Sequence, residues 1–152
     1  MWNYNAIIAL MVDSIEAVLA ANAYFYRVLS LADAAAMRGI WLASPEVTCI
    51  HPGWEALIGY EPVQKSWSSI FGVQGPLHLW PGEETVRFEF GQAWVTCIEN
   101  IDVSATEAGG IVQARALNAF TSTPTGWKLT QHQAEPTAGV VWPARNARLA
   151  RN

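Results

Sequence analysis

Hydrophobic residues recur every three or four positions over the first half of the chain, which is the spacing of amphipathic helices. Asp13-Ser14 can cap a helix, and an apolar stripe then runs over residues 15–29 with one polar interruption, Asn22. Residues 1–12 are also largely apolar. The pattern leaves open whether they extend this helix backwards or pack as a separate turn.

Two shorter helices are predicted after the first. Asp33 can cap a helix over residues 34–41, and Pro62 stands in the first turn of a helix that begins at Tyr60 and ends near Gly72. A short apolar strand over residues 47–50 lies between these two helices.

The second half of the chain changes to a period of two, which is typical of strands. Glycine-containing turns divide it into consecutive segments with hairpin spacing, over residues 85–90, 94–103, 111–121 and 127–135. We therefore predict an α+β domain in which helices cover one face of a curved, largely antiparallel sheet.

One stretch between the helices has the features of a pocket mouth. An apolar strand runs directly into His51, Pro52-Gly53 ends the ladder, and Trp54 and Tyr60 follow. A titratable group at the edge of an apolar region predicts a binding or catalytic site.

Composition limits the functions that are open to the chain. Its 152 residues fit a single domain, with a core over residues 13–136, an N-terminal extension and a C-terminal tail over residues 137–152. Hydrophobic residues make up 51% and charged residues 14%, so we expect apolar surface that faces a ligand or a second subunit. A net charge of −4 with 9 Lys and Arg argues against nucleic acid and against an anionic membrane surface. The apolar run over residues 6–12 is too short to span a bilayer and lacks signal-peptide features, which predicts a cytoplasmic protein.

The sequence predicts neither a metal site nor a cofactor. Cys49 and Cys97 both lie in apolar strand-like runs and are expected to be buried, although a single disulfide between them stays open. His51 and His132 are the imidazoles suited to ligation, and no carboxylate lies at ligand spacing to either. No glycine-rich phosphate loop and no serine nucleophile elbow occurs.

Several motifs occur together between residues 14 and 136. They are Asp33 with Met37 and Trp41, Cys49-Ile50-His51-Pro52-Gly53-Trp54 with Gly59, Val63 with Trp67, Ala93-Trp94-Val95-Thr96-Cys97-Ile98-Glu99, Asn118-Ala119-Phe120, and Gly126-Trp127-Lys128-Leu129 with His132 and Pro136. In these motifs the chain resembles the SnoaL-like branch of the nuclear transport factor 2-like superfamily.

The resemblance implies a cone, in which a strongly curved mixed sheet of the cystatin-like roll type wraps around a long N-terminal helix and leaves a pocket between them. It also implies homodimerisation through the outer face of the sheet. Members include ketosteroid isomerases, polyketide cyclases, dehydratases and non-catalytic modules, so fold alone does not give function.

The resemblance to ketosteroid isomerases breaks down at the catalytic positions. His51 stands where those enzymes carry their aspartate base, Phe25 where they carry a tyrosine, and Ala116 where they carry a proton-donating aspartate. An enolate would lack both donors, which argues against steroid isomerisation. Many relatives also end in three consecutive histidines, and here the run is Gln131-His132-Gln133.

Three residues are the candidates for chemistry. His51 can serve as a general acid or base, and the alternative is a structural histidine that bonds the backbone at a strand end. Glu99 interrupts an apolar strand on the same face as Val95 and Cys97, and is either a proton shuttle or a paired charge at a subunit interface. Asn118 can hydrogen-bond a ligand carbonyl, or satisfy local backbone instead.

Aromatic and polar residues near these three are expected to line the pocket. Trp54 and Trp67 are the preferred ligand contacts because they follow the His51 turn closely, and Tyr26 and Tyr60 are further candidates. The alternative for these aromatics is ordinary core packing.

The last strand should present Gln131 and Gln133 to the pocket. Strict alternation places His132 on the opposite face with Lys128, which should seek water or an interface. His132 is therefore a weaker candidate for a site role.

The leading hypothesis is a cofactor-independent pocket protein that binds a small apolar, carbonyl-bearing molecule. If it is catalytic, His51 would exchange a proton with the substrate while Glu99 or Asn118 orients it, as in an isomerase, cyclase or dehydratase. The alternative is a non-catalytic ligand-binding or dimerisation module whose cavity is filled by its own aromatic side chains.

Overall fold

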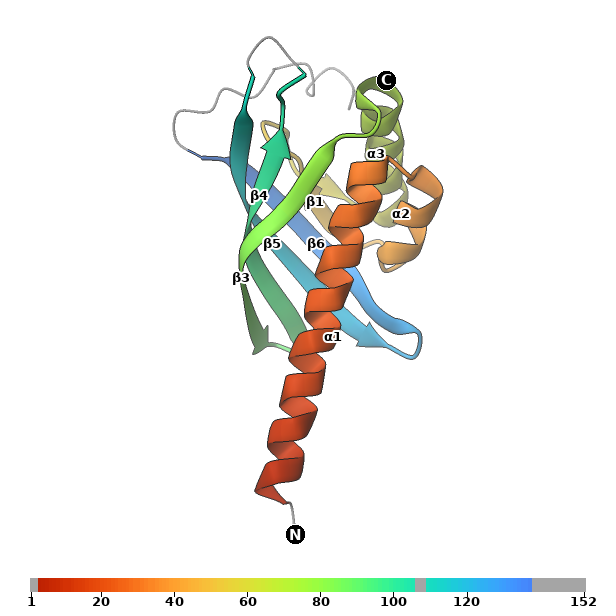
Figure 1. The fold of residues 1–152 in the computed structure, drawn as a ribbon. Coiled ribbons are helices and arrows are strands. Elements are labelled where there is room, and N and C mark those ends of the chain that lie inside the picture. The colour runs from red at the N-terminus through yellow and green to blue at the C-terminus, as the bar shows by residue number, and fades with distance from the viewer. Residues whose placement is uncertain (1–2, 106–108, 138–152) are drawn as a thin grey trace.

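The computed structural model describes residues 3–105 and 109–137. It contains three helices and one six-stranded sheet, and the long helix lies across the sheet's concave side (Figure 1). The elements in chain order are α1 (Tyr4–Leu31), α2 (Ala34–Ile40), β1 (Thr48–Ile50), β2 (Leu57–Ile58), α3 (Tyr60–Gln74), β3 (His78–Glu89), β4 (Gln92–Asp102), β5 (Ile111–Thr123) and β6 (Gly126–Pro136). The predicted α+β class and the curved sheet around an N-terminal helix are confirmed.

The sheet is mixed, with strand order β2-β1-β6-β5-β4-β3. Strands β3 to β6 pair as consecutive antiparallel hairpins, whereas β1 runs parallel to β6, with Cys49 opposite His132. This parallel pairing brings the end of β1, where His51 follows, beside the middle of the last strand.

Helix α1 is continuous through the segment whose structure the sequence left open. Asn3 caps it, so the described residues of the N-terminal extension belong to the helix and Asp13-Ser14 lies inside it rather than at its start. The helix ends at Ala32, which adopts a left-handed conformation with φ 54°. Its 28 residues make it long and apolar enough to cross a membrane, and it is the one such helix among the residues described.

Only the C-terminal half of α1 belongs to the core. Val18, Phe25, Tyr26 and Val28 are buried against the sheet, whereas the N-terminal turns extend beyond it (Figure 1). The buried residues of this half lie on one side of the helix, as the predicted apolar stripe requires, because residues three and four apart share one helix face.

A bulge in β6 changes which side chains face the core. Ala119 pairs with Gln131 but the next residue, Phe120, pairs with Leu129, so Thr130 is an extra residue in the ladder. Leu129 and His132 are consequently both buried, although they are three positions apart.

Two smaller expectations differ from the structure. Strand β3 begins at His78, before the predicted strand over residues 85–90, and residues 78–82 pair with β4. The third helix continues beyond Gly72 to Gln74. The expected burial of Cys49 and Cys97 is confirmed, and both thiols are free.

Candidate active site

His51 is held at the end of β1 by a tight turn and by α3. Its carbonyl accepts a hydrogen bond from the Trp54 amide (2.9 Å), and Gly53 takes up the positive φ of 81° that this turn requires. The ring is buried edge-on against the rings of Trp54 (4.7 Å between centroids) and Trp67 (4.5 Å). Its Nε2 lies 2.8 Å from Ser66 Oγ on α3.

The Ser66 hydroxyl determines which nitrogen of His51 carries the proton. Ser66 Oγ donates to the Val63 carbonyl oxygen (2.6 Å), so its single proton is already committed. It must therefore accept from His51, which makes Nε2 the protonated nitrogen and leaves a lone pair on Nδ1, which lies 3.9 Å from Cys49 Sγ.

A second group of buried polar residues lies on the neighbouring strands. Tyr26 donates its hydroxyl proton to Glu99 Oε1 (2.9 Å) and accepts one from Asn118 Nδ2 (3.0 Å). Asn118 Oδ1 lies 2.6 Å from His132 Nδ1. The four residues come from α1, β4, β5 and β6, so the network joins the helix to three strands.

The same logic assigns the tautomer of His132. An amide oxygen only accepts, so the bond to Asn118 requires a proton on His132 Nδ1 and leaves Nε2 unprotonated. That Nε2 lies 3.8 Å from Glu99 Oε1. The two imidazoles are thus held in opposite tautomers, and each keeps one basic nitrogen.

The network reaches the surface through Asn22. Asn118 Nδ2 also donates to Asn22 Oδ1 (2.9 Å), and Asn22 Nδ2 donates to Glu84 Oε2 (2.8 Å) on β3. Asn22, the polar interruption in the helical stripe, is therefore fully buried, and both its amide oxygen and its amide nitrogen form hydrogen bonds. It fixes the orientation of the Asn118 amide.

Burial shifts the pKa of all three ionisable groups away from their ordinary values. Desolvation raises the pKa of Glu99 to about 7, although the Tyr26 hydrogen bond opposes this shift. Desolvation also lowers the pKa of His132 to about 3 and that of His51 to about 3, with a smaller contribution to His51 from His132. At neutral pH the imidazoles are uncharged, and Glu99 populates both its protonated and its ionised form.

These groups meet at one small inner cavity of about 70 Å³. His51, Glu99 and His132 contribute its titratable groups, and Trp67 contributes an aromatic wall. The remaining lining residues are mostly apolar: Leu29, Pro52, Ile70, Gln74, Leu77, Leu79 and Ile101. The Trp67 indole N–H, which is buried, has no acceptor among the described residues.

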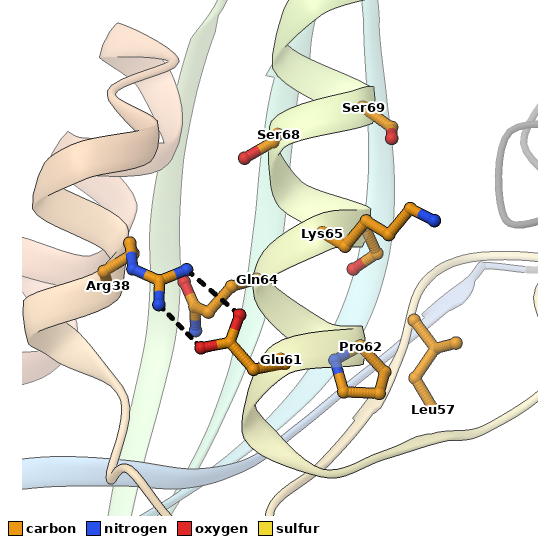
Figure 2. A pocket seen from close by; sticks show the side chains of 9 residues that line it. Arg38, Leu57, Glu61, Pro62, Gln64, Lys65, Ser68 and Ser69 are labelled. Carbon is orange, nitrogen blue, oxygen red and sulfur yellow. Dashed lines mark hydrogen bonds and ion pairs between the residues drawn. The ribbon is translucent and has the colours of Figure 1, made fainter. Parts of the chain in front are cut away.

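A larger hollow lies outside the cone. It measures about 690 Å³ and runs along α3, where Arg38 and Glu61 form an exposed ion pair at 2.7 Å (Figure 2). Ser66 lines this hollow and also bonds His51, so one side chain separates it from the inner site. Its described lining residues include no imidazole and no buried carboxylate, and the smaller cavity is therefore the candidate site.

The structure brings the two strongest sequence candidates, His51 and Glu99, to the cavity with Trp67. Asn118 and Tyr26 lie behind it and hold His132 and Glu99 in place.

Two predicted wall residues are placed differently. Trp54 contacts the His51 ring but is not part of the cavity wall. Tyr60 donates its hydroxyl proton to the Arg38 carbonyl (2.7 Å) away from the cavity.

The predicted orientation of the last strand is wrong. The bulge at Thr130 reverses the alternation, so His132 points into the cavity, whereas Gln131 and Gln133 line shallow hollows elsewhere.

The sequence analysis did not identify Ser66 as a site residue. It could have been found as a polar residue that shares the apolar side of a predicted helix with Val63, Trp67 and Ile70. Among the residues described, no group of three His, Cys, Asp or Glu side chains is placed to hold a metal ion.

Comparisons with known proteins agree with this fold. A protein from Streptomyces avermitilis of the nuclear transport factor 2-like family, provisionally described as a dehydratase, is 29% identical over 84% of this chain and 98% of its own, with a TM-score of 0.76. A nuclear transport factor 2-like protein with a cystatin-like fold from Novosphingobium aromaticivorans is 16% identical over 100% and 99% of the two chains, with a TM-score of 0.71. A protein from Parabacteroides distasonis, provisionally described as a ketosteroid isomerase, is 16% identical over 80% and 86%, with a TM-score of 0.62.

Among curated proteins, none matches the chain. The family model of the SnoaL-like domain matches residues 18–138, which include every residue of the inner site. The chain therefore belongs to the SnoaL-like domain family of the nuclear transport factor 2-like superfamily.

Proposed function

We propose that the chain is a cofactor-independent acid–base enzyme that dehydrates a small β-hydroxy carbonyl compound in the inner cavity. The observation that carries this proposal is the meeting of His51, Glu99 and His132 at one cavity, although each is almost fully buried. Three ionisable groups from separate segments of the chain are buried at the same cavity.

Such an arrangement opposes stability, because burying an ionisable group is unfavourable unless it is fully paired. Within the described part of the chain, Glu99 accepts one hydrogen bond, from Tyr26, and lies 3.8 Å from His132 Nε2. A module whose cavity served only packing would be more stable with apolar side chains at these positions. Clustered, strongly shifted titratable groups in a cavity therefore favour catalysis over the alternative of a non-catalytic binding module.

Glu99 is suited to carry the proton. A group whose pKa lies near the working pH is available as both acid and base, and the pKa of Glu99 is raised to about 7. The ionised carboxylate takes the proton from the carbon next to the carbonyl. The bond between the β-carbon and its hydroxyl oxygen then breaks as the carbon–carbon double bond forms. Glu99 returns the proton to the departing hydroxyl, which leaves as water.

Trp67 is suited to bind the carbonyl oxygen. Trp67 lines the cavity, and its indole N–H has no acceptor among the described residues, so we assign it as the donor to a developing enolate oxygen. The neutral imidazoles of His51 and His132 offer lone pairs that accept from a substrate hydroxyl. These groups orient the substrate without adding charge to the cavity.

The size of the cavity restricts the substrate. About 70 Å³ is far below the roughly 300–1,000 Å³ of pockets that enclose a drug-sized ligand. We therefore assign the cavity to the reacting end of the substrate, with the β-hydroxy carbonyl inside and any further groups toward Leu29 and Leu77 at its wall. The dehydratase assignment is supported by the similar protein from Streptomyces avermitilis.

The test is turnover of a panel of small β-hydroxy ketones and aldehydes, followed by the ultraviolet absorbance of the conjugated product. Glu99→Gln should lower kcat by about 10²–10⁴-fold. Trp67→Phe keeps an aromatic ring without the N–H, and should lower kcat by about 10²–10³-fold. The matched control is Glu55→Gln, an exposed glutamate away from the cavity, which should leave kcat unchanged.

Two results would count against the proposal. One is full activity in Glu99→Gln. The other is thermal stabilisation of the wild type by these compounds without conversion, which would support the non-catalytic binding module instead.

A further inference from the structure

The N-terminal turns of α1 expose apolar side chains on all sides. Tyr4 is 74% exposed, Leu10 is 61% exposed and Met11 is 55% exposed, and no charged residue occurs from residue 3 to residue 11. A helix that is hydrophobic all round is normally buried in protein or in a membrane. This segment therefore requires a partner that the isolated chain does not supply.

The apolar surface continues from the helix onto the sheet. A groove of about 460 Å³ lies between them and is lined by Ile7, Leu10, Met11, Ser14, Phe88 and Trp127. Phe90, at the turn after β3, is 87% exposed beyond it. Because the helix and the groove share residues, a partner that packs on the helix also reaches the groove.

A membrane is a poor fit for this surface. The free segment of about ten residues is about 15 Å long, half the thickness of the hydrocarbon core. The rest of α1 cannot follow it into lipid, because Asn22 and Tyr26 are bonded to Asn118 within the core. An interfacial anchor usually carries Lys or Arg on its polar face, and the first basic residue of the chain is Arg27.

We propose that the partner is a second copy of this chain, with the projecting helix ends packed antiparallel against each other and each covering the other's groove. The exposed Tyr4, Ile7, Ile8 and Met11 have the i, i+3, i+4, i+7 spacing of a helix–helix seam. A two-fold axis lets the same patch serve both copies. The absence of charge in residues 3–11 means that two identical surfaces meet without repulsion.

The available area matches a stable dimer. The patch exposes seven large apolar side chains: Tyr4, Ile7, Ile8, Leu10, Met11, Phe88 and Phe90. If each contributes on the order of 100 Å², the patch approaches the ~800 Å² per partner that a specific interface buries. This interface differs from the outer-face dimer expected from the family resemblance, because it uses the helix and the strand ends beside it.

The test is the mass of the full-length chain across a concentration series, measured by sedimentation velocity. The wild type should be a dimer, and Leu10→Glu should raise the dissociation constant by at least about 100-fold, because it places a carboxylate in the apolar groove that the partner helix covers. The matched control is Leu31→Glu, which alters an equally exposed leucine at the other end of the same helix and should leave the dimer intact. Circular dichroism melting of both variants checks that the fold is kept.

Several outcomes would overturn the proposal. They are a monomeric wild type, a dimer that survives Leu10→Glu as an outer-face dimer would, an equal loss of the dimer in Leu31→Glu, and flotation of the wild type as a monomer with phosphatidylcholine vesicles. None of these measurements depends on the proposed catalytic activity.

Discussion

Replacing Glu99 with glutamine should make the protein more stable at alkaline pH. The glutamine keeps an oxygen that accepts from Tyr26 and removes the buried ionisable carboxyl. The carboxyl pKa is about 7 in the folded protein against an ordinary value of 4.5, so between these values the folded state binds more protons than the unfolded state. Wild-type stability therefore contains a contribution that is present below pH 4.5 and is lost as the pH rises through 7.

The size of the effect follows from the pKa difference. At about 1.4 kcal/mol per pKa unit, the free energy of unfolding of Glu99→Gln minus that of the wild type should increase by about 2–3 kcal/mol between pH 5 and pH 8. The pKa values of His51 and His132, lowered to about 3, act in the opposite sense at acid pH, but they occur in both proteins and largely cancel in the difference.

The assay is urea denaturation of both proteins at pH 5, 6, 7 and 8, with tryptophan fluorescence as the signal. Glu55→Gln serves as the matched control, because it makes the same substitution at an exposed glutamate away from the cavity. A difference for Glu99→Gln that does not change with pH would refute the reasoning, since it would mean that burial leaves the Glu99 carboxyl unperturbed.

Two further predictions concern the hydrogen bonds around the cavity. Ser66→Ala removes the acceptor of the His51 Nε2–H, so long-range ¹H–¹⁵N spectra should show that imidazole leaving its single Nε2–H tautomer; an unchanged spectrum would contradict the assignment. Tyr26→Phe removes a donor to Glu99 and an acceptor of Asn118, so urea denaturation should show a loss of about 1–3 kcal/mol at pH 7. It should also raise the pKa of Glu99 further, because that hydrogen bond holds the pKa down, and a carboxyl titration that stays in place would contradict this role.

The sequence predicted the architecture because each level of pattern pointed the same way. Helical spacing before residue 75, strand alternation after it and glycine turns between hairpins are local signals, and the structure follows them. The burial of Glu99 was also predictable, because strict alternation in β4 places it with Val95 and Cys97.

The face of the last strand was not predictable from alternation. The bulge at Thr130 arises from how β6 pairs with β5, and one extra residue reverses every side chain that follows. His132 thereby moves from the predicted outer face to the cavity, and Gln131 and Gln133 move away from it. A pairing register is a tertiary property that no short window of sequence contains.

The contacts that give the site its properties join residues far apart in the chain. Tyr26 and Glu99 are 73 positions apart, and Asn22 and Asn118 are 96 positions apart. The sequence identified these side chains as unusual in an apolar setting, but only the folded arrangement shows which of them meet. The tautomers of His51 and His132 likewise follow from their hydrogen-bond partners, Ser66 and Asn118, in the folded chain.

The central claim is that Glu99, His51 and His132 form a proton-transfer site within the apolar core. Its most direct test is nuclear magnetic resonance titration of the full-length protein from pH 5 to pH 8, which follows the Glu99 carboxyl carbon and the imidazole nitrogens. The account predicts a Glu99 midpoint near 7 and two imidazoles that stay neutral across the whole range. A Glu99 midpoint near 4.5, or imidazoles that take up protons near pH 6.5, would contradict it.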